Sequence, residues 1–234
     1  MRLRVLLTGL LMLVPLPALA DVTARYTAGS GKLTVEAASN GDSRITIDGP
    51  RQATIIHVAA GDFVKMPDKD GIVRTARAED AFAALAPPGV FDAPAVTFTS
   101  KQGGTDSVAG FSGIRWTYGP AGEEPLELLV SADPRLAPVG VALRRLVDLI
   151  LAVTGTVLGP DALRPILASG TPLRVATIGK DRPEPLIQLD SVATDPIDPD
   201  RFGIWSPVLS GKQFAALVTP TPDNPPVAPP APRP

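Results

Sequence analysis

Few side chains in this sequence could carry chemistry, and the single histidine is the first to consider. His57 lies in residues 54–58, a β-branched run that predicts a strand. A histidine can act as a general base or join a Ser-His-Asp triad assembled from distant residues. No serine stands in a Gly-x-Ser-x-Gly pattern, and Ser112 lacks the required glycine spacing. We therefore interpret His57 as an ordinary strand side chain and keep a hydrolase only as a third hypothesis.

An acidic cluster near the C-terminal end is the second group with ligand-forming side chains. Calcium prefers several carboxylates combined with backbone carbonyls. The spacing here does not match an EF-hand loop, and two prolines stiffen the segment. The favoured interpretation is a solvated loop with Asp-Pro turns, so we predict no metal site at the four aspartates, which are Asp190, Asp195, Asp198 and Asp200.

Composition excludes several further classes of protein. The chain has 234 residues and no cysteine, with 22 Lys and Arg against 24 Asp and Glu. A disulfide framework, a cysteine zinc site and an iron–sulfur cluster are therefore excluded. Nucleic-acid binders carry basic stripes, so the near balance of charge predicts no nucleic acid partner. Glycines at 29–31 and 103–104 do not lead from a strand into a helix, and no phosphate loop or other cofactor site is predicted.

The first twenty residues have the features of a secretory signal peptide. Arg2 and Arg4 precede an apolar run over residues 5–16, and residues 18–20 (Ala-Leu-Ala) give signal peptidase its small side chains. An uncleaved anchor is the alternative, but this run is short for a span of about 20 residues. A cysteine-free exported protein suits a Gram-negative periplasm, where stray thiols are oxidised. We therefore expect a periplasmic protein with no transmembrane span after cleavage.

The next part of the chain, to about residue 131, predicts an antiparallel sheet. Apolar and polar residues alternate in short runs, which indicates strands with one buried face. Strands at roughly ten-residue spacing favour a meander that curls into a barrel or half-barrel. Gly103-Gly104 is expected to be a turn, and residues 77–86 a short helix. The expected strands are 22–26, 32–36, 44–48, 53–58, 63–66, 72–75, 95–100, 107–109, 114–118 and 126–131.

Residues 138–158 lose the alternation and predict a helix. Its second half is apolar on every face, so something must cover its outer side. A short helix predicted at 161–168, a second protein or lipid could each provide that cover. Further strands are expected at 173–178 and 186–193, with an extended piece at 203–209.

The chain is thus divided into three parts. Residues 1–20 are the signal peptide, and residues 21–218 form a single half-barrel domain with a helical insertion at about 138–168. Residues 219–234 are a proline-rich tail that we expect to be disordered, because eight of the last fifteen residues are proline.

Four short motifs, taken in order, resemble a known family. Residues 108–110 (Val-Ala-Gly) precede residues 116–118 (Trp-Thr-Tyr), which resembles a recurrent V-x-G…Y strand pair. Three later segments are similar to the W-V-S-x-D, G-x-P-L and I-D-P-x-x-F motifs; they are residues 129–133, 170–173 and 197–202. Over residues 21–209 the chain therefore resembles uncharacterised exported domains related to the lipoprotein carriers LolA and LolB.

The resemblance implies an α+β fold, in which helices cover the concave face of a curved antiparallel half-barrel. In such carriers the concave face is apolar and holds acyl chains, and the carriers are not enzymes. The expected cavity positions are Val35, Ile45, Ile47, Ile56, Phe98 and Ile114 from strands, with Leu146, Ile150 and Val153 from the covering helix.

Two functional hypotheses lead from these observations. The first is a periplasmic, non-enzymatic binding or carrier protein for an apolar ligand, such as a lipid or a lipidated protein. The second is an envelope interaction or scaffold module that has no ligand and uses its proline-rich tail. A carrier needs a covering helix that opens, whereas a scaffold does not.

Cleavage after Ala20 is the first testable prediction. Exported protein should begin at Asp21, because the small residues before it fit signal peptidase. The intact mass of secreted material measures this directly. A mass that still includes residues 1–20 would contradict both the cleavage and the periplasmic location.

Overall fold

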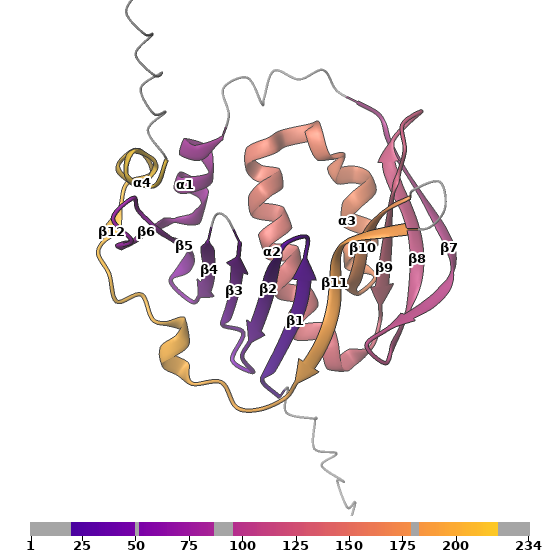
Figure 1. The fold of residues 1–234 in the computed structure, drawn as a ribbon, viewed down its shortest axis with the longest axis horizontal. Helices are drawn as coiled ribbons and strands as arrows, with labels where there is room; N and C mark the ends of the chain where they lie inside the picture. The colour runs from indigo at the N-terminus through magenta and orange to yellow at the C-terminus, as the bar shows by residue number, and fades with distance from the viewer. Residues whose placement is uncertain (1–19, 50–51, 87–95, 179–182, 220–234) are drawn as a thin grey trace, which may run out of the picture.

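A computed structural model describes residues 20–49, 52–86, 96–178 and 183–219. The expected signal peptide and nearly all of the proline-rich tail lie outside the described residues. Within them, twelve strands form one open sheet in the order β12-β6-β5-β4-β3-β2-β1-β11-β10-β9-β8-β7. Figure 1 shows the sheet curving from β6 round to β7, with α2 and α3 inside the curve. The expected fold class, an α+β half-barrel with helices on its concave face, is confirmed.

The strands are joined mainly as antiparallel hairpins, and only β12 pairs in parallel, with β6. They are β1 (Val22–Ala28), β2 (Gly31–Ala37), β3 (Ser43–Asp48), β4 (Ala53–Val58), β5 (Gly61–Pro67), β6 (Val73–Arg77), β7 (Phe98–Val108), β8 (Phe111–Pro120), β9 (Leu126–Ser131), β10 (Thr171–Ile178), β11 (Pro183–Ala193) and β12 (Val208–Leu209). The four α helices of the described residues are α1 (Ala78–Leu85), α2 (Ala137–Thr154), α3 (Pro160–Ala168) and α4 (Gly211–Val218).

The prediction of a turn at Gly103-Gly104 was wrong. These glycines lie inside β7, where the pairing with β8 shifts register between Gln102 and Thr105. Glycine tolerates such a bulge, so the strand continues through it. The hairpin turn is made instead by Ala109 and Gly110, which both have positive φ as a two-residue hairpin turn requires.

Helix α2 covers the concave face and is anchored at its N-terminal end. It contacts β1, β2, β3 and β10. Leu136 and Val139 are fully buried there. The Thr171 hydroxyl donates a hydrogen bond of 2.8 Å to the Leu136 carbonyl. A β-carbon on Gly140 would lie only 2.5 Å from Oγ1 of Thr171, so the helix approaches β10 as closely as it does because residue 140 is glycine.

The predicted helix over 138–158 is shorter than expected at its C-terminal end. Gly155 adopts φ +57°, which ends α2, and residues Gly155–Leu158 form the 3₁₀ helix η3. The apolar second half of α2 is covered by this chain itself. Helices α1 and α3 both contact α2. Leu151 is buried, and Leu149 is half-buried where it packs against the core.

The C-terminal segment contains a helix that the sequence reasoning missed. The 3₁₀ helix η4 (Pro199–Phe202) precedes the residues 203–209 that were expected to be extended, β12 lies at the end of those residues, and α4 follows. Ser210 caps α4 in a reciprocal arrangement with Gln213, a Ser-x-x-Gln signal that was present in the sequence. Helix α4 contacts α1 and β6, and Phe214 belongs to the main core cluster.

Helix α4 should therefore be required for stability. Phe214 is 0% exposed, so Phe214→Ala should lower the free energy of unfolding by about 3–5 kcal/mol. Leu217 on the same helix is 37% exposed, and Leu217→Ala should cost less than about 1 kcal/mol. Urea unfolding of both variants measures the difference. Equal, small losses would mean that α4 does not belong to the cooperative core.

Candidate functional site

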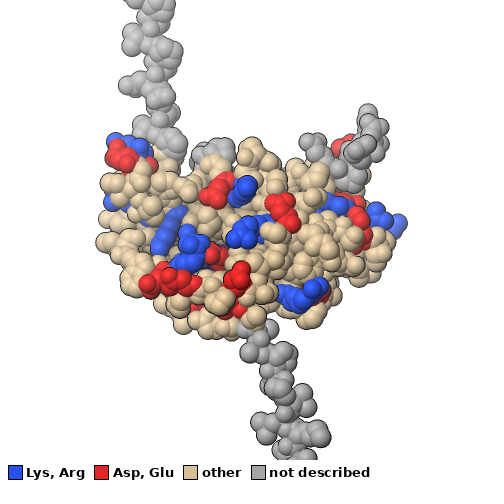
Figure 2. Space-filling view, turned by 60° about the horizontal axis from the view of Figure 1, so that its bottom comes forward, with Lys and Arg blue, Asp and Glu red and all other residues tan. Residues whose placement is uncertain are grey.

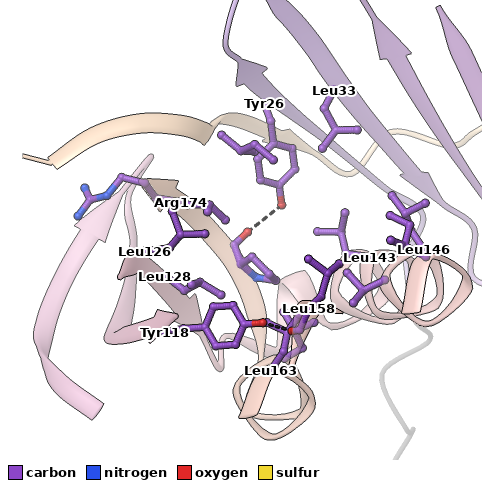
Figure 3. A pocket seen from close by; sticks show the side chains of 16 residues that line it. Tyr26, Leu33, Tyr118, Leu126, Leu128, Leu143, Leu146, Leu158, Leu163 and Arg174 are labelled. Atoms are coloured by element: carbon purple, nitrogen blue, oxygen red, sulfur yellow. Dashed lines mark hydrogen bonds between the residues drawn. The ribbon is translucent and has the colours of Figure 1, made fainter. Parts of the chain in front are cut away.

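An apolar cavity of about 340 Å³ lies between α2, α3 and the concave face of the sheet. Figure 3 shows Leu143 and Leu146 facing it from α2, with Tyr26 and Leu33 opposite on the sheet. Leu158 follows α2, and Leu163 comes from α3. The lining is almost entirely hydrocarbon and consists of Tyr26, Leu33, Tyr118, Leu126, Leu128, Leu143, Leu146, Val147, Ile150, Leu158, Leu163, Leu167, Pro172, Arg174, Val175 and Ile187.

The two tyrosine hydroxyls on the wall are occupied by backbone partners. Tyr26 donates a hydrogen bond of 3.1 Å to the carbonyl of Pro172, and Tyr118 donates to the carbonyl of Leu158. Burial raises the pKa of both phenols, that of Tyr118 to about 12. Both groups are therefore neutral at physiological pH and already have an acceptor. The cavity wall thus presents apolar surface to a ligand and no unused hydroxyl donor.

Arg174 marks the one charged position on the cavity wall. Its Nη2 donates hydrogen bonds of 2.9 Å to Asp106 and 2.7 Å to Glu127. Burial alone would lower the pKa of Arg174, but the hydrogen bonds from Glu127 and Asp106 outweigh it and raise that pKa. In Figure 3 the guanidinium points away from the cavity, so mainly its alkyl stem lies toward the wall. Both carboxylates hold this cation through Nη2, and its Nε is buried without a hydrogen-bond partner among the described residues, so the charge of Arg174 is already compensated.

Tyr118 is positioned by Phe98, which in turn packs against the start of α3. Its ring stacks on Phe98 of β7 with centroids 5.3 Å apart. Gly159, at the start of α3, has φ +52° and no room for a side chain, because a β-carbon there would overlap the Phe98 ring. The α3 end of the cavity is therefore fixed by the β7–β8 hairpin.

Two of the nine positions expected from the sequence lie on the cavity wall, Leu146 and Ile150. Val35 and Ile45 are buried in the core cluster, and Ile47 packs against that cluster. These three side chains are thus part of the core that supports the cavity. The ligand contacts assigned to these positions stay predictions.

The other four expected positions lie outside the cavity wall. Phe98 supports Tyr118 from behind, and Ile114 pairs with Val130 of β9. Val153 is buried on α2 beyond Ile150. Ile56 is a correction: its side chain faces a hollow on the convex side, because its neighbour Ile55 takes the concave side and strand side chains alternate.

Most of the wall was missed by the sequence reasoning. Leu33 could have been found, since it lies two positions before Val35 on the same strand face. Leu126 and Leu128 of β9 alternate with Glu127, but the apolar Leu129 and Val130 follow, so the pattern that marks the inward face is lost within the strand. Tyr26 and Pro172 are 146 positions apart, and no local pattern indicates that they meet.

The residues first considered for chemistry lie elsewhere. His57 Nδ1 is 2.9 Å from Asp62 Oδ1 across the β4–β5 pair. Asp190 accepts a hydrogen bond from Thr27, and Asp198 caps η4. In the described part of the chain no group of three or more His, Asp or Glu side chains could hold a metal ion. No described helix combines the length and apolarity needed to cross a membrane.

Comparison with known proteins gives only a distant likeness. No protein-family model matches the chain, and no curated protein sequence matches it. Among solved structures, that of MucB is similar with a TM-score of 0.36 and 13% identity, over 80% of this chain and 57% of MucB. The structure of MucB in complex with MucA(peri) gives 0.36 and 14%, over 82% and 56%. The chain thus spans little more than half the length of these proteins, and a TM-score this low supports no conclusion about the function of the chain.

Titration of the two tyrosines tests the geometry of the cavity wall. They are the only tyrosines in the chain, and both have raised pKa values in the folded protein. Tyrosinate absorbance should therefore stay low at pH 10 in native protein, whereas protein unfolded in urea should titrate near pH 10. The folded state keeps its protons longer, so stability should fall as pH rises from about 10 towards 12. A native titration with its midpoint at pH 10 would contradict the buried hydroxyls.

Proposed function

We propose that this chain is a periplasmic, non-enzymatic binding or carrier protein for an apolar ligand. The ligand would be a lipid, or the lipid chain of a modified protein, with its hydrocarbon part in the cavity between α2, α3 and the sheet. One observation carries the proposal, namely a cavity of about 340 Å³ with an almost purely hydrocarbon wall. Small-molecule sites have volumes of about 300–1,000 Å³, so this cavity is near the lower end of that range.

The chemistry of the wall favours hydrocarbon over a polar ligand. Both tyrosine hydroxyls have backbone acceptors, and the guanidinium of Arg174 is held by two carboxylates. A polar group placed inside would lose its water without gaining a partner, which is unfavourable. A hydrocarbon chain would instead cover the exposed apolar lining at about 25 cal/mol per Å².

The same wall supports a role without catalysis. Its polar side chains are two neutral phenols and one paired arginine, and His57 with its partner Asp62 is not among the lining residues. General acid–base or nucleophilic chemistry needs a group within hydrogen-bonding reach of the substrate. The expected signal peptide and the lack of cysteine support the periplasmic location.

The second candidate function is an envelope interaction module. The observation that favours it is the proline-rich segment after residue 219, which suits a spacer or a docking segment. In that case the cavity would stay empty, and α2 would have no need to open.

Native mass spectrometry of protein purified from the periplasm separates the two functions. The carrier function predicts added mass equal to a lipid, which organic extraction removes. Protein that never carries such mass, and that binds no hydrophobic fluorescent probe after extraction, would overturn the carrier proposal in favour of the interaction module.

A cavity-filling substitution gives a matched test. Val147 lines the cavity, whereas Val141 on the same helix is 39% exposed and does not line it. Val147→Phe should reduce the affinity for a hydrophobic fluorescent probe by about tenfold or more, because the ring occupies the ligand's space. Val141→Phe should leave the affinity within about twofold.

Thermal melts of both variants provide the stability control. A Val147→Phe protein that melts like the parent and still binds the probe at full affinity would place the probe elsewhere. Equal losses of affinity in both variants would point to a general effect on α2 and not to the cavity.

A further inference from the structure

A second hollow, of about 290 Å³, lies on the convex face of the sheet, on the opposite side from the apolar cavity. Strands β3 to β6 form its floor, and the segment after η4 forms its rim. Figure 2 shows Lys and Arg side chains gathered in the left-central part of the face it presents, with acidic ones below them. The wall mixes cationic, polar and apolar groups, and consists of Arg44, Gln52, Thr54, Ile56, Lys65, Met66, Pro67, Val73, Asp200, Arg201, Gly203 and Trp205.

The three cations in this hollow differ in how they are paired. Arg201 donates to both oxygens of Glu36, with Nη2 at 2.8 Å from Oε2. Lys65 donates one hydrogen bond of 2.7 Å to the carbonyl of Gly203, which leaves two of its N–H donors. The Nε of Arg44 is buried and has no hydrogen-bond partner among the described residues; its approach to Glu36 is 3.8 Å. The Arg44 side chain as a whole is 24% exposed, so a ligand in the hollow can reach its guanidinium from the open side, although not the buried Nε.

Arg44 and Lys65 are the two cations of the hollow without a hydrogen bond to a carboxylate of the described residues. Glu36 holds Arg201, which Asp198 also attracts, and Asp200 lines the hollow, so three cations face three carboxylates. Burial, followed by repulsion from Arg44, lowers the pKa of Lys65, which is consistent with these two cations lying close together. The two oxygens of a ligand's carboxylate could accept from both.

Trp205 stands at the rim and is held there although it is 78% exposed. Its indole lies against Gly203, where a β-carbon would overlap the ring. The chain is tethered on both sides of Trp205, by Lys65 to the Gly203 carbonyl and by a 3.1 Å hydrogen bond between Ser206 and Thr75. A large aromatic ring fixed in water beside cations is typical of a recognition surface, because it binds without much loss of side-chain entropy.

We infer that this hollow is a second binding site, which takes a carboxylate carried next to an apolar group. The carboxylate accepts hydrogen bonds from Lys65 and from the exposed side of the Arg44 guanidinium, and the apolar group packs against Trp205. Two sources share this chemistry: the end of a peptide with an apolar last residue, and a free small carboxylic acid. The site shares no residue with the lipid cavity, so it does not depend on the carrier function.

A membrane surface is a poorer match for this hollow. The Arg44 side chain lies within the hollow and is only 24% exposed, so a flat array of headgroups would not engage it well. A single carboxylate on a narrow apolar stem can enter, and the rim indole then covers the stem.

The test compares two probes that differ only in charge. N-acetylphenylalanine carries the carboxylate, and N-acetylphenylalanine amide does not. The chain has two tryptophans, so in a Trp116→Phe background the emission reports Trp205 alone. We expect saturable quenching by the acid and none by the amide, with calorimetry on the unmodified mature protein as the second measurement. Equal binding of the two probes, or no binding of either, overturns the inference.

Matched arginine variants locate the carboxylate. Arg44→Gln should weaken binding of the acid by at least about tenfold, since one charge-assisted hydrogen bond is lost. Arg25→Gln removes the same charge from an exposed position on β1 outside the hollow, and should change affinity by less than about twofold. Thermal melts exclude unfolding as the cause. Equal effects of the two variants would indicate attraction by net charge alone and overturn the assigned site.

Two further ligands show whether the carboxylate belongs to a peptide end or to a free acid, and whether the hollow binds a membrane surface instead. A tetrapeptide that ends in phenylalanine should bind more tightly than N-acetylphenylalanine if a peptide end is recognised, and equally if a free acid is. Phosphatidylglycerol vesicles should not bind in an Arg44-dependent manner. Vesicle binding that Arg44→Gln abolishes, without any response to the acid, would identify a membrane contact and overturn the inference.

Discussion

The structure depends on one constraint, which is that the concave face of a strongly curved sheet must be covered by a few helices. Helix α2 meets this constraint at its N-terminal end, where Gly140 lies against Thr171 and the side chains of Leu136 and Val139 are fully buried. The curve continues beyond α2 towards β8 and β7, which α3 contacts. Helix α3 covers that part but does not fill it, and the apolar cavity is the space that remains.

The cavity is kept apolar by the way its polar groups are paired. Tyr26 and Tyr118 each donate to a backbone carbonyl, and Arg174 is held by Asp106 and Glu127. These bonds join β1 to β10, η3 to β8, and β10 to the β7 and β9 strands. The same contacts that hold the walls together therefore engage the two hydroxyls and the Arg174 Nη2 that a polar ligand could otherwise use, which is why the proposed ligand is apolar.

The two faces of the sheet differ in chemistry, and this separates the two proposed sites. Concave positions are filled by aliphatic side chains under the helices, whereas the convex face near β3 to β6 carries Arg44, Lys65 and Trp205. The η4 helix and the segment after it cross the convex face, and Arg201 of η4 bonds Glu36 on β2. One sheet thus has a hydrocarbon pocket on one side and a charged hollow on the other.

The sequence by itself determined the sheet, the covering helix and its apolar character, because alternation and helical spacing are local patterns. It did not determine which of two adjacent side chains faces inward: Ile55 and Ile56 are equally apolar, and only curvature and the cover on each face assign Ile55 to the core. Tyr26 meets Pro172 across 146 positions, and Arg201 meets Glu36 across 165. Such partners are selected by the packing of distant segments, so the cavity wall and the convex hollow were decided only by the tertiary structure.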